Sequence, residues 1–219
     1  MLKDEKGRAT RVKPDFPLYN YPNRHNLTIL NSTAMDFKSL VLTRQSDRNY
    51  LDQPIEKDKL SRILECARLS PSACNAQPWH IIVVDNPELK NKIADATSAK
   101  LLGMNHFTKQ APIHLVIVEE AANLSSGFGS WVKRKHFPLI DIGIIAGHIC
   151  LAAASEGLGT CMIGWFDESK VKKLLGVPSS KRVQLIITLG YSAQKTRDKI
   201  RKPTDKIVSY NGYGKPDLT

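Results

Sequence analysis

A chain of 219 residues with 42% apolar content can bury one ample hydrophobic core, so a single main domain is expected. Its formal net charge is +11. Its four cysteines form no Cys-x-x-Cys pair and no histidine stands at a zinc-like spacing, which argues against a structural zinc site and against a disulfide framework.

The first 34 residues contain the proline-rich stretch KPDFPLYNYPNRHN and show no helical period. This pattern predicts an irregular N-terminal arm over 1–34, followed by a main domain over 35–219. The N-terminal residues lack the apolar core of a secretory signal, and no stretch approaches the roughly 18 apolar residues of a membrane span. We therefore expect a cytoplasmic protein with no membrane partner.

Apolar residues at helical spacing predict helices, in chain order, over 35–46, 54–70, 86–103, 138–159 and 167–178. Short apolar runs predict strands over 79–85, 111–120, 160–166 and 181–192. Pro54 is expected to start the second helix and Pro71 to end it, with Asn86 and Asp167 as N-caps and Gly157 as a C-cap. Because helices and strands alternate, the fold class is α+β, or a three-layer αβα domain built on one sheet.

The positive charge is concentrated near the C-terminus, where residues 170–219 hold twelve Lys and Arg against three acidic residues. Such a segment can bind nucleic acid, or it can surround an anionic cofactor or substrate. Its basic residues are not interleaved with aromatic residues, as they are in a surface that stacks bases. A small anionic ligand is therefore the preferred interpretation, and no nucleic-acid partner is expected.

No Ser-His-Asp set, metal cluster, Walker loop or Gly-x-Gly-x-x-Gly motif occurs in the sequence. The side chains therefore offer no evident nucleophile or base, and no metal site is expected. An enzyme without such groups generally takes its chemistry from a cofactor.

Two cationic segments could hold a phosphate. The first, RQSDR at 44–48, places Arg44, Ser46 and Arg48 at alternate positions. The second, KIRK at 199–202, places Lys199 and Arg201 on one side if the segment is extended. Arg forms bidentate, charge-assisted bonds with phosphate. Each segment alone could equally be a solvated basic loop, but a cofactor bearing a phosphate could bring both together.

The stretch SPSACNAQPWH at 70–80 lies between a predicted helix and a predicted strand. Ser72, Asn75 and Gln77 offer hydroxyl and amide groups to a planar ligand rich in heteroatoms. Without a ligand, the stretch is a well-capped turn. Trp79 is more typical of core or interface packing than of catalysis.

Taken together, these segments make the chain resemble the nitroreductase family of flavin mononucleotide (FMN) enzymes, from about residue 37 to about residue 210. The matching pieces, in the family's order, are TRQSDRNYLDQPI, LSPSACNAQPWHIIVV, APIHLVIV, SEGLGTCMIGWF and LGY…KIRKPTDKIV. The pattern PSxxNxQPW before an apolar strand is the specific one. The resemblance implies a three-layer αβα nitroreductase-like fold with a mostly antiparallel central sheet. It also implies a homodimer with FMN at the interface.

The resemblance further implies which residues bind the cofactor. The family's first flavin segment is matched by Arg44, Gln45, Ser46 and Arg48, and its C-terminal phosphate clamp by Lys199 and Arg201. The strand that passes the flavin ring near N5 is matched by Met162, Ile163 and Gly164. The segment supplied by the partner subunit is matched by Pro71, Ser72, Ala73, Asn75 and Gln77. Asp141 occupies the place where some members have a polar ring contact.

The implied function is an oxidoreductase that passes hydride from NADH or NADPH through N5 of FMN to a nitroaromatic, quinone or similar small-molecule acceptor, by a ping-pong mechanism. No side chain is then a catalytic residue, because FMN carries the chemistry. The region that often forms a substrate lid in the family is short here, at 122–137. Two alternatives remain open: a flavin enzyme of the same fold that dehalogenates or reacts with oxygen, and a basic module without enzymatic activity that binds nucleic acid or a protein partner.

Overall fold

The computed structural model describes residues 36–98, 104–121 and 136–215. These residues belong to one compact unit, Met35–Thr219. The predicted arm at 1–34 and most of the short region at 122–137 lie outside the described residues.

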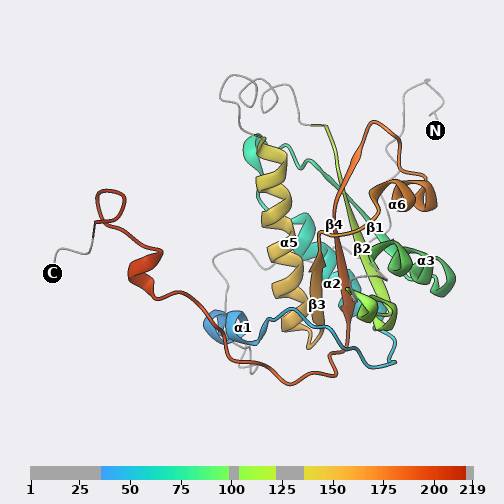
Figure 1. Ribbon diagram of the computed structural model, residues 1–219, viewed down its shortest axis with the longest axis horizontal. Helices are drawn as coiled ribbons and strands as arrows, with labels where there is room; N and C mark the ends of the chain where they lie inside the picture. The colour runs from blue at the N-terminus through green and yellow to red at the C-terminus, as the bar shows by residue number, and fades with distance from the viewer. Residues whose placement is uncertain (1–35, 99–103, 122–135, 216–219) are drawn as a thin grey trace, which may run out of the picture. The chain divides into compact units, whose positions relative to one another are not determined.

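One four-stranded sheet organises the described residues (Figure 1). Its strands are β1 (Trp79–Val84), β2 (Ile113–Glu119), β3 (Gly159–Ile163) and β4 (Arg182–Gly190). They lie in the order β1-β2-β4-β3, and each neighbouring pair is antiparallel. The predicted antiparallel α+β sheet is therefore confirmed, and β3 lies at one edge of it.

Helices cover both faces of this sheet, which gives the three layers that the alternation of elements predicted. On one face α2 (Lys57–Arg68) and α5 (Phe137–Ser155) pack over Leu115 and Ile117. On the other face α3 (Pro87–Thr97) and α6 (Glu168–Leu175) pack over Val116 and Val118. Because successive side chains of a strand point to opposite faces, the continuous apolar run of β2 supplies both cores.

A register shift in β4 changes which core the residues before it face. Ile117 pairs with Leu185 while the next residue, Val118, pairs with Val183, so Gln184 is the extra residue of a β-bulge. As a result Val183 joins the core under α3 and α6, and Leu185 packs against the core under α2 and α5.

Most of the predicted helix ends are confirmed. The side chain of Asn86 accepts a hydrogen bond from Leu89 N at 2.9 Å, and that of Asp167 accepts one from Lys170 N at 3.0 Å. At the end of α5, Gly157 has a φ of +75° and donates to the Ala154 carbonyl. This glycine follows the last turn directly, in the Schellman arrangement that favours glycine.

The prediction that Pro54 starts the second helix was wrong, because α2 begins three residues later, at Lys57. Glu56 is extended, with a ψ of 134°, and acts as the N-cap residue. The extended segment lets Ile55 pack against the core and lets the Glu56 carboxylate accept a hydrogen bond from Tyr191 Oη at 2.7 Å. Tertiary contacts thus decide where this helix begins.

Helix α5 has 19 residues and is long and apolar enough, by length and composition alone, to cross a membrane, which the sequence analysis did not anticipate. In the fold it lies against the sheet, and Ile145, Ile149 and Ala153 are fully buried there. Burial in the core accounts for the apolar residues on this side of the helix.

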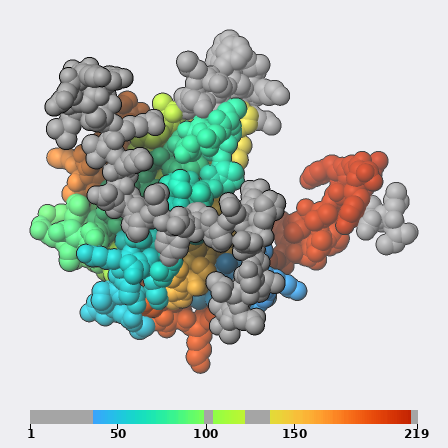
Figure 2. Space-filling model, turned by 180° about the vertical axis from the view of Figure 1, so that it is seen from behind, coloured from blue at the N-terminus to red at the C-terminus, as the bar shows by residue number. Residues whose placement is uncertain are grey.

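The remaining described elements are short. They are α1 (Phe37–Thr43) and the 3₁₀ turns η1 (Ala73–Asn75), η3 (His106–Gln110) and η4 (Thr204–Lys206). Asp36 caps α1 through hydrogen bonds from Lys38 N and Ser39 N. Every described residue from 201 to 215 is exposed, as the red segment in Figure 2 illustrates.

Candidate functional site

The two cationic segments meet in one pocket of about 340 Å³. Arg44, Gln45, Ser46 and Arg48 line it from the segment after α1, and residues 197–201 line it from the segment after β4. Arg197, Lys199 and Arg201 bring its cationic side chains to five, against the single carboxylate of Asp198. We call this the cationic pocket. Both segments therefore line one pocket, as the prediction of a shared phosphate ligand requires.

The edge of β3 positions the first segment. Ser46 forms a parallel bridge with Thr160, and Asp47 N donates to the Thr160 carbonyl at 2.9 Å. The contact is so close that a Cβ added to Gly159 would lie 2.6 Å from Asp47 Oδ2. Glycine at 159 therefore leaves room for the Asp47 side chain beside the sheet edge.

Gln45 joins the two segments through its buried side-chain amide. Its Nε2 donates to Asp47 Oδ1 at 2.9 Å and to the Lys195 carbonyl at 3.2 Å. Its Oε1 accepts from Arg197 N at 3.1 Å. Because both ends of the amide are used within the protein, the Gln45 side chain organises the pocket, and a ligand can reach only its backbone.

Arg197 is a residue of the pocket that sequence reasoning missed. Its guanidinium donates to the Ser46 carbonyl at 2.8 Å and so fastens the C-terminal segment to the first one. The signal was present, since Arg197, Lys199 and Arg201 recur at every second position of an extended stretch.

The pocket carries an excess of positive charge. Partial burial, followed by the nearby guanidiniums of Arg44, Arg201 and Arg197, lowers the pKa of Lys199. Lys199 also donates a hydrogen bond to the Arg44 carbonyl. Like charges held this close together are stabilised by an anion, and the donor geometry of Arg suits a phosphate.

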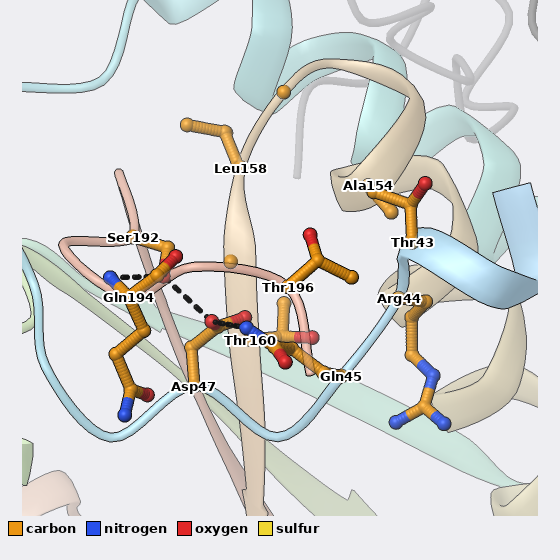
Figure 3. Close-up of a pocket in the computed structure, with 12 residues that line it drawn as sticks. Thr43, Arg44, Gln45, Asp47, Ala154, Leu158, Thr160, Ser192, Gln194 and Thr196 are labelled. Atoms are coloured by element: carbon orange, nitrogen blue, oxygen red, sulfur yellow. Dashed lines mark hydrogen bonds between the residues drawn. The ribbon is translucent and has the colours of Figure 1, made fainter. Parts of the chain in front are cut away.

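A second, smaller pocket of about 180 Å³ lies beside the first and shares Arg44 and Gln45 with it (Figure 3). At its centre is the buried carboxylate of Asp47, which accepts a hydrogen bond from Ser192 Oγ at 2.6 Å as well as that from Gln45. In Figure 3 the Arg44 side chain points away from this carboxylate. The Asp47 carboxylate therefore accepts hydrogen bonds that hold the two segments together. Asp47 is a structural residue of the site.

The turn at 70–80 is strained and exposed. Cys74, Asn75 and Gln77 have positive φ angles of 51°, 52° and 48°, a region that non-glycine residues seldom occupy. Gln77 N donates to Ser72 Oγ at 2.9 Å, and the Gln77 side-chain amide donates to the Asn75 carbonyl at 3.1 Å. Strain of this kind persists where surrounding contacts impose it, and it is frequent at functional sites.

Asp141 imposes part of that geometry. Its carboxylate is only 3% exposed on α5 and accepts a hydrogen bond from Ala73 N at 3.1 Å. The sequence analysis placed a ring contact here; in the fold, this side chain supports the turn.

The turn does not line the cationic pocket of its own chain. Of the predicted flavin-contact residues, the pocket gathers Arg44, Gln45, Ser46, Arg48, Lys199 and Arg201. It leaves out Pro71, Ser72, Ala73, Asn75, Gln77 and Asp141, and it also leaves out Met162, Ile163 and Gly164. Pro71, Asn75 and Gln77 are exposed, as residues available to a second subunit must be.

The third predicted segment lies at the free edge of β3. Met162 is 42% exposed, whereas Ile163 is 3% exposed and packs into the core, so Ile163 can offer only backbone groups to a ligand. Gly164 is exposed, and a Cβ added to it would meet no atom within 4 Å. Neither packing nor backbone conformation thus accounts for glycine at 164.

Among the described residues, no group of three or more His, Cys, Asp or Glu side chains could hold a metal ion. Cys150 and Cys161 are buried, and burial raises the pKa of each thiol.

The chain is similar to known proteins of one family. The model of the nitroreductase family matches residues 41–191. A protein named NADH dehydrogenase from Thermus thermophilus is 30% identical over 201 residues, which cover 80% of this chain and 96% of that protein. The oxygen-insensitive NADPH nitroreductase of Helicobacter acinonychis is 30% identical over 190 residues, with 75% and 89% coverage. The solved structure of an FMN-dependent nitroreductase from Clostridium difficile superposes with a TM-score of 0.63 at 30% identity, covering 80% of this chain and 98% of that one.

Proposed function

Because the chain belongs to the nitroreductase family, we propose that it is an NAD(P)H-dependent oxidoreductase that binds FMN in the cationic pocket. The observation that carries this proposal is the convergence of five cationic side chains from two segments about 150 residues apart. The named relatives support FMN as the cofactor and NADH or NADPH as the reductant.

The residues present fit the phosphate of FMN. A phosphate monoester carries up to two negative charges at neutral pH, and the cationic pocket holds a net charge of +4 from five cations and one carboxylate. In this proposal Arg44, Lys199 and Arg201 hold the phosphate, and the hydroxyl of Ser46 donates to it or to the ribityl chain. The anion in turn relieves the repulsion that lowers the pKa of Lys199.

Arg48 has a different task in this proposal. Arg48 lines the pocket two residues after Ser46, and its backbone N–H donates to Gln194 Oε1 at 2.6 Å. Its charge also lowers the pKa of the Cys161 thiol, although burial raises that pKa overall. A guanidinium at this place can stabilise negative charge on the pyrimidine edge of the ring.

FMN bound in the pocket would supply the chemistry of hydride transfer from NAD(P)H to an oxidised acceptor, in a ping-pong sequence. The protein's own part is to position the ring and to keep water from it. In this proposal the backbone at Met162–Gly164 would hold the edge of the ring, and the open space at Gly164 would leave room for it. The acceptors proposed are nitroaromatics, quinones and similar small molecules.

The active form proposed is a homodimer in which each FMN contacts the partner's turn at 70–80. Three observations support it: this turn is exposed, it is held in a strained form by Asp141, and it does not reach the pocket of its own chain. Exposed apolar side chains on α1 and α5, such as Phe37 at 69% and Ile140 at 54%, supply surface for such an interface.

Spectroscopy tests the proposal directly. The purified protein should be yellow or should become yellow with added FMN, and NADH or NADPH should bleach the flavin bands under anaerobic conditions. A chain that neither carries nor takes up FMN contradicts the proposal. Cations gathered in a concave pocket also suit a small anion better than an extended nucleic acid, so a retained oligonucleotide in place of FMN would point to the alternative.

A further inference from the structure

The smaller pocket beside the cationic pocket, which we call the Asp47 pocket, contains a buried carboxylate whose two oxygens are used unequally. Asp47 is only 4% exposed, and the hydrogen bonds from Gln45 Nε2 and Ser192 Oγ both go to its Oδ1. Among the described residues, none donates a hydrogen bond to Oδ2 or forms an ion pair with this carboxylate. A buried charge is costly unless it is paired. Oδ2 is therefore a binding group that the protein itself does not use.

The surroundings of Oδ2 are rich in oxygen atoms. Oδ2 faces Gly159, which lines the same pocket and whose added Cβ would lie 2.6 Å from it. Thr160, Ser192 and Thr196 also line the pocket, and Figure 3 shows these hydroxyl-bearing side chains around Asp47. Carboxylate, hydroxyl and water oxygens are the ligands that hard cations prefer.

The size of the Asp47 pocket limits what it can hold. Its volume of about 180 Å³ corresponds to roughly six water molecules at 30 Å³ each. Pockets for organic ligands generally begin at about 300 Å³. The pocket therefore suits a small ion with part of its water shell better than an organic molecule.

The neighbouring cationic side chains are engaged elsewhere. In Figure 3 the Arg44 side chain points away from the Asp47 carboxylate. The Gln45 amide stands between Asp47 and Arg197, since it donates to Asp47 Oδ1 and accepts from Arg197 N and Nε. Lys199 donates to the Arg44 carbonyl. These charges still repel a cation in the Asp47 pocket, and they repel a divalent ion twice as strongly as a monovalent one.

The C-terminal end of α5 offers a further attraction for a cation. Ala154 in its last turn and Gly157 just after it line the Asp47 pocket. The C-terminal end of a helix carries partial negative charge from its carbonyl groups and favours cations. Lys59 already uses this end, because its Nζ donates to the Glu156 carbonyl at 3.0 Å.

From this arrangement we infer that the Asp47 pocket binds a monovalent alkali cation, K⁺ or Na⁺, through Asp47 Oδ2 and the surrounding hydroxyl and water oxygens. Such an ion needs one carboxylate, so the site forms although no three His, Cys, Asp or Glu side chains of the described residues are grouped. The inference does not depend on FMN.

Thermal unfolding of the full-length protein in KCl, NaCl and choline chloride, at equal chloride concentration and without added FMN, tests the inference. Choline is too large for the pocket, and constant chloride keeps any anion effect on the cationic pocket the same. At ten times its Kd, a bound ion raises the Tm of a domain of this size by about 3–5 °C. We expect such a rise in KCl or NaCl relative to choline chloride, and the larger of the two rises identifies the preferred ion.

Two variants locate the effect. Asp47→Asn keeps the shape of the side chain and removes its charge, so the rise in Tm should disappear. Asp52→Asn is the matched control, because Asp52 is an exposed carboxylate in the same stretch, and the rise should stay complete. Equal Tm values of the wild type in all three salts would overturn the inference. A complete rise in Asp47→Asn, or a lost rise in Asp52→Asn, would overturn it as well.

NMR line widths of Na⁺ and of Rb⁺, an analogue of K⁺, provide a test on the wild type alone, in case Asp47→Asn does not fold. The protein should broaden at least one of these signals, and excess KCl should sharpen it again while choline chloride does not. If both signals stay sharp, or if choline chloride sharpens them equally, the inference is wrong. Uptake of FMN is measured separately, so the ion site and the proposed function can fail independently.

Discussion

Lys199 donates a hydrogen bond from its ammonium group to the backbone carbonyl of Arg44, a residue 155 positions earlier in the chain. The contact fixes the C-terminal segment against the segment that follows α1, and it places two cations at one pocket. Their repulsion contributes to the lowered pKa of Lys199, after the effect of partial burial. A pocket built in this way is stabilised by an anion.

Replacing Arg201 with Ala should weaken FMN binding by roughly 1.5–3 kcal/mol, the range for a hydrogen bond to a charged group. Titration of the apo protein with FMN, followed by flavin fluorescence, measures the change. Lys206→Ala is the matched control, because Lys206 is exposed in the same C-terminal segment and does not line the pocket. An unchanged affinity in the Arg201 variant means that the phosphate lies elsewhere.

Mixed dimers test which chain supplies the turn at 70–80. A chain with Arg201→Ala is paired with a chain with Asn75→Ala, and FMN binding is compared with that of each homodimer. If the turn acts across the interface, one site combines the Arg201→Ala pocket with the Asn75→Ala turn. The other site combines an unchanged pocket with an unchanged turn. Half of the sites should then bind FMN as tightly as the wild type. If every site is impaired, each chain serves its own flavin, and the proposed cross-subunit contact is wrong.

Gly159→Ala should lower the stability of the apo protein by about 1–3 kcal/mol, the usual cost of overpacking. The added methyl group would lie 2.6 Å from Asp47 Oδ2 and would push the 44–48 segment from the edge of β3. Urea denaturation measures the loss. Gly164→Ala is the companion variant: its methyl group meets no protein atom, so apo stability should hold while FMN binding weakens. If both variants had the same free energy of unfolding, the Asp47 side chain would be able to move away from the added methyl group at 159 at little cost.

His114 should make the fold sensitive to acid. It is fully buried, its Nε2 hydrogen-bonds the Thr108 carbonyl at 2.9 Å, and burial lowers its pKa to about 4 from the usual 6.5. The unfolded chain therefore binds a proton more readily than the folded one. Stability contributed by neutral His114 is complete above pH 6.5 and is lost as the pH falls toward 4, by about 3 kcal/mol in total.

The variant His114→Gln provides the control for this titration, since its amide can still donate to the Thr108 carbonyl but does not ionise. Urea denaturation at several pH values between 4 and 7 should give a shallower pH dependence for the variant than for the wild type. Parallel pH profiles would mean that His114 does not become charged on unfolding in this range.

Residue patterns alone were sufficient for much of the fold. The apolar runs at 79–85 and 111–120 predicted β1 and β2, and in β2 the run is continuous because a strand buried on both faces needs no alternation. Asn86, Asp167 and Gly157 predicted helix ends because each acts on backbone groups within a few residues. The predicted start of α2 was wrong because Ile55 packs against the core and Glu56 bonds to Tyr191. Both contacts are with residues far away in the sequence.

The sequence by itself determined which residue types were present: two cationic segments, a proline-bounded turn and a chain without its own nucleophile. Only the tertiary structure decided their roles. In the fold, Gln45 and Asp47 support the pocket and Arg197 lines it. Asp141 accepts a hydrogen bond from Ala73 N, and Trp165 is exposed. The physical reason is that caps and periodicity act over a few residues. Burial and charge repulsion, in contrast, depend on which distant segments the sheet brings together.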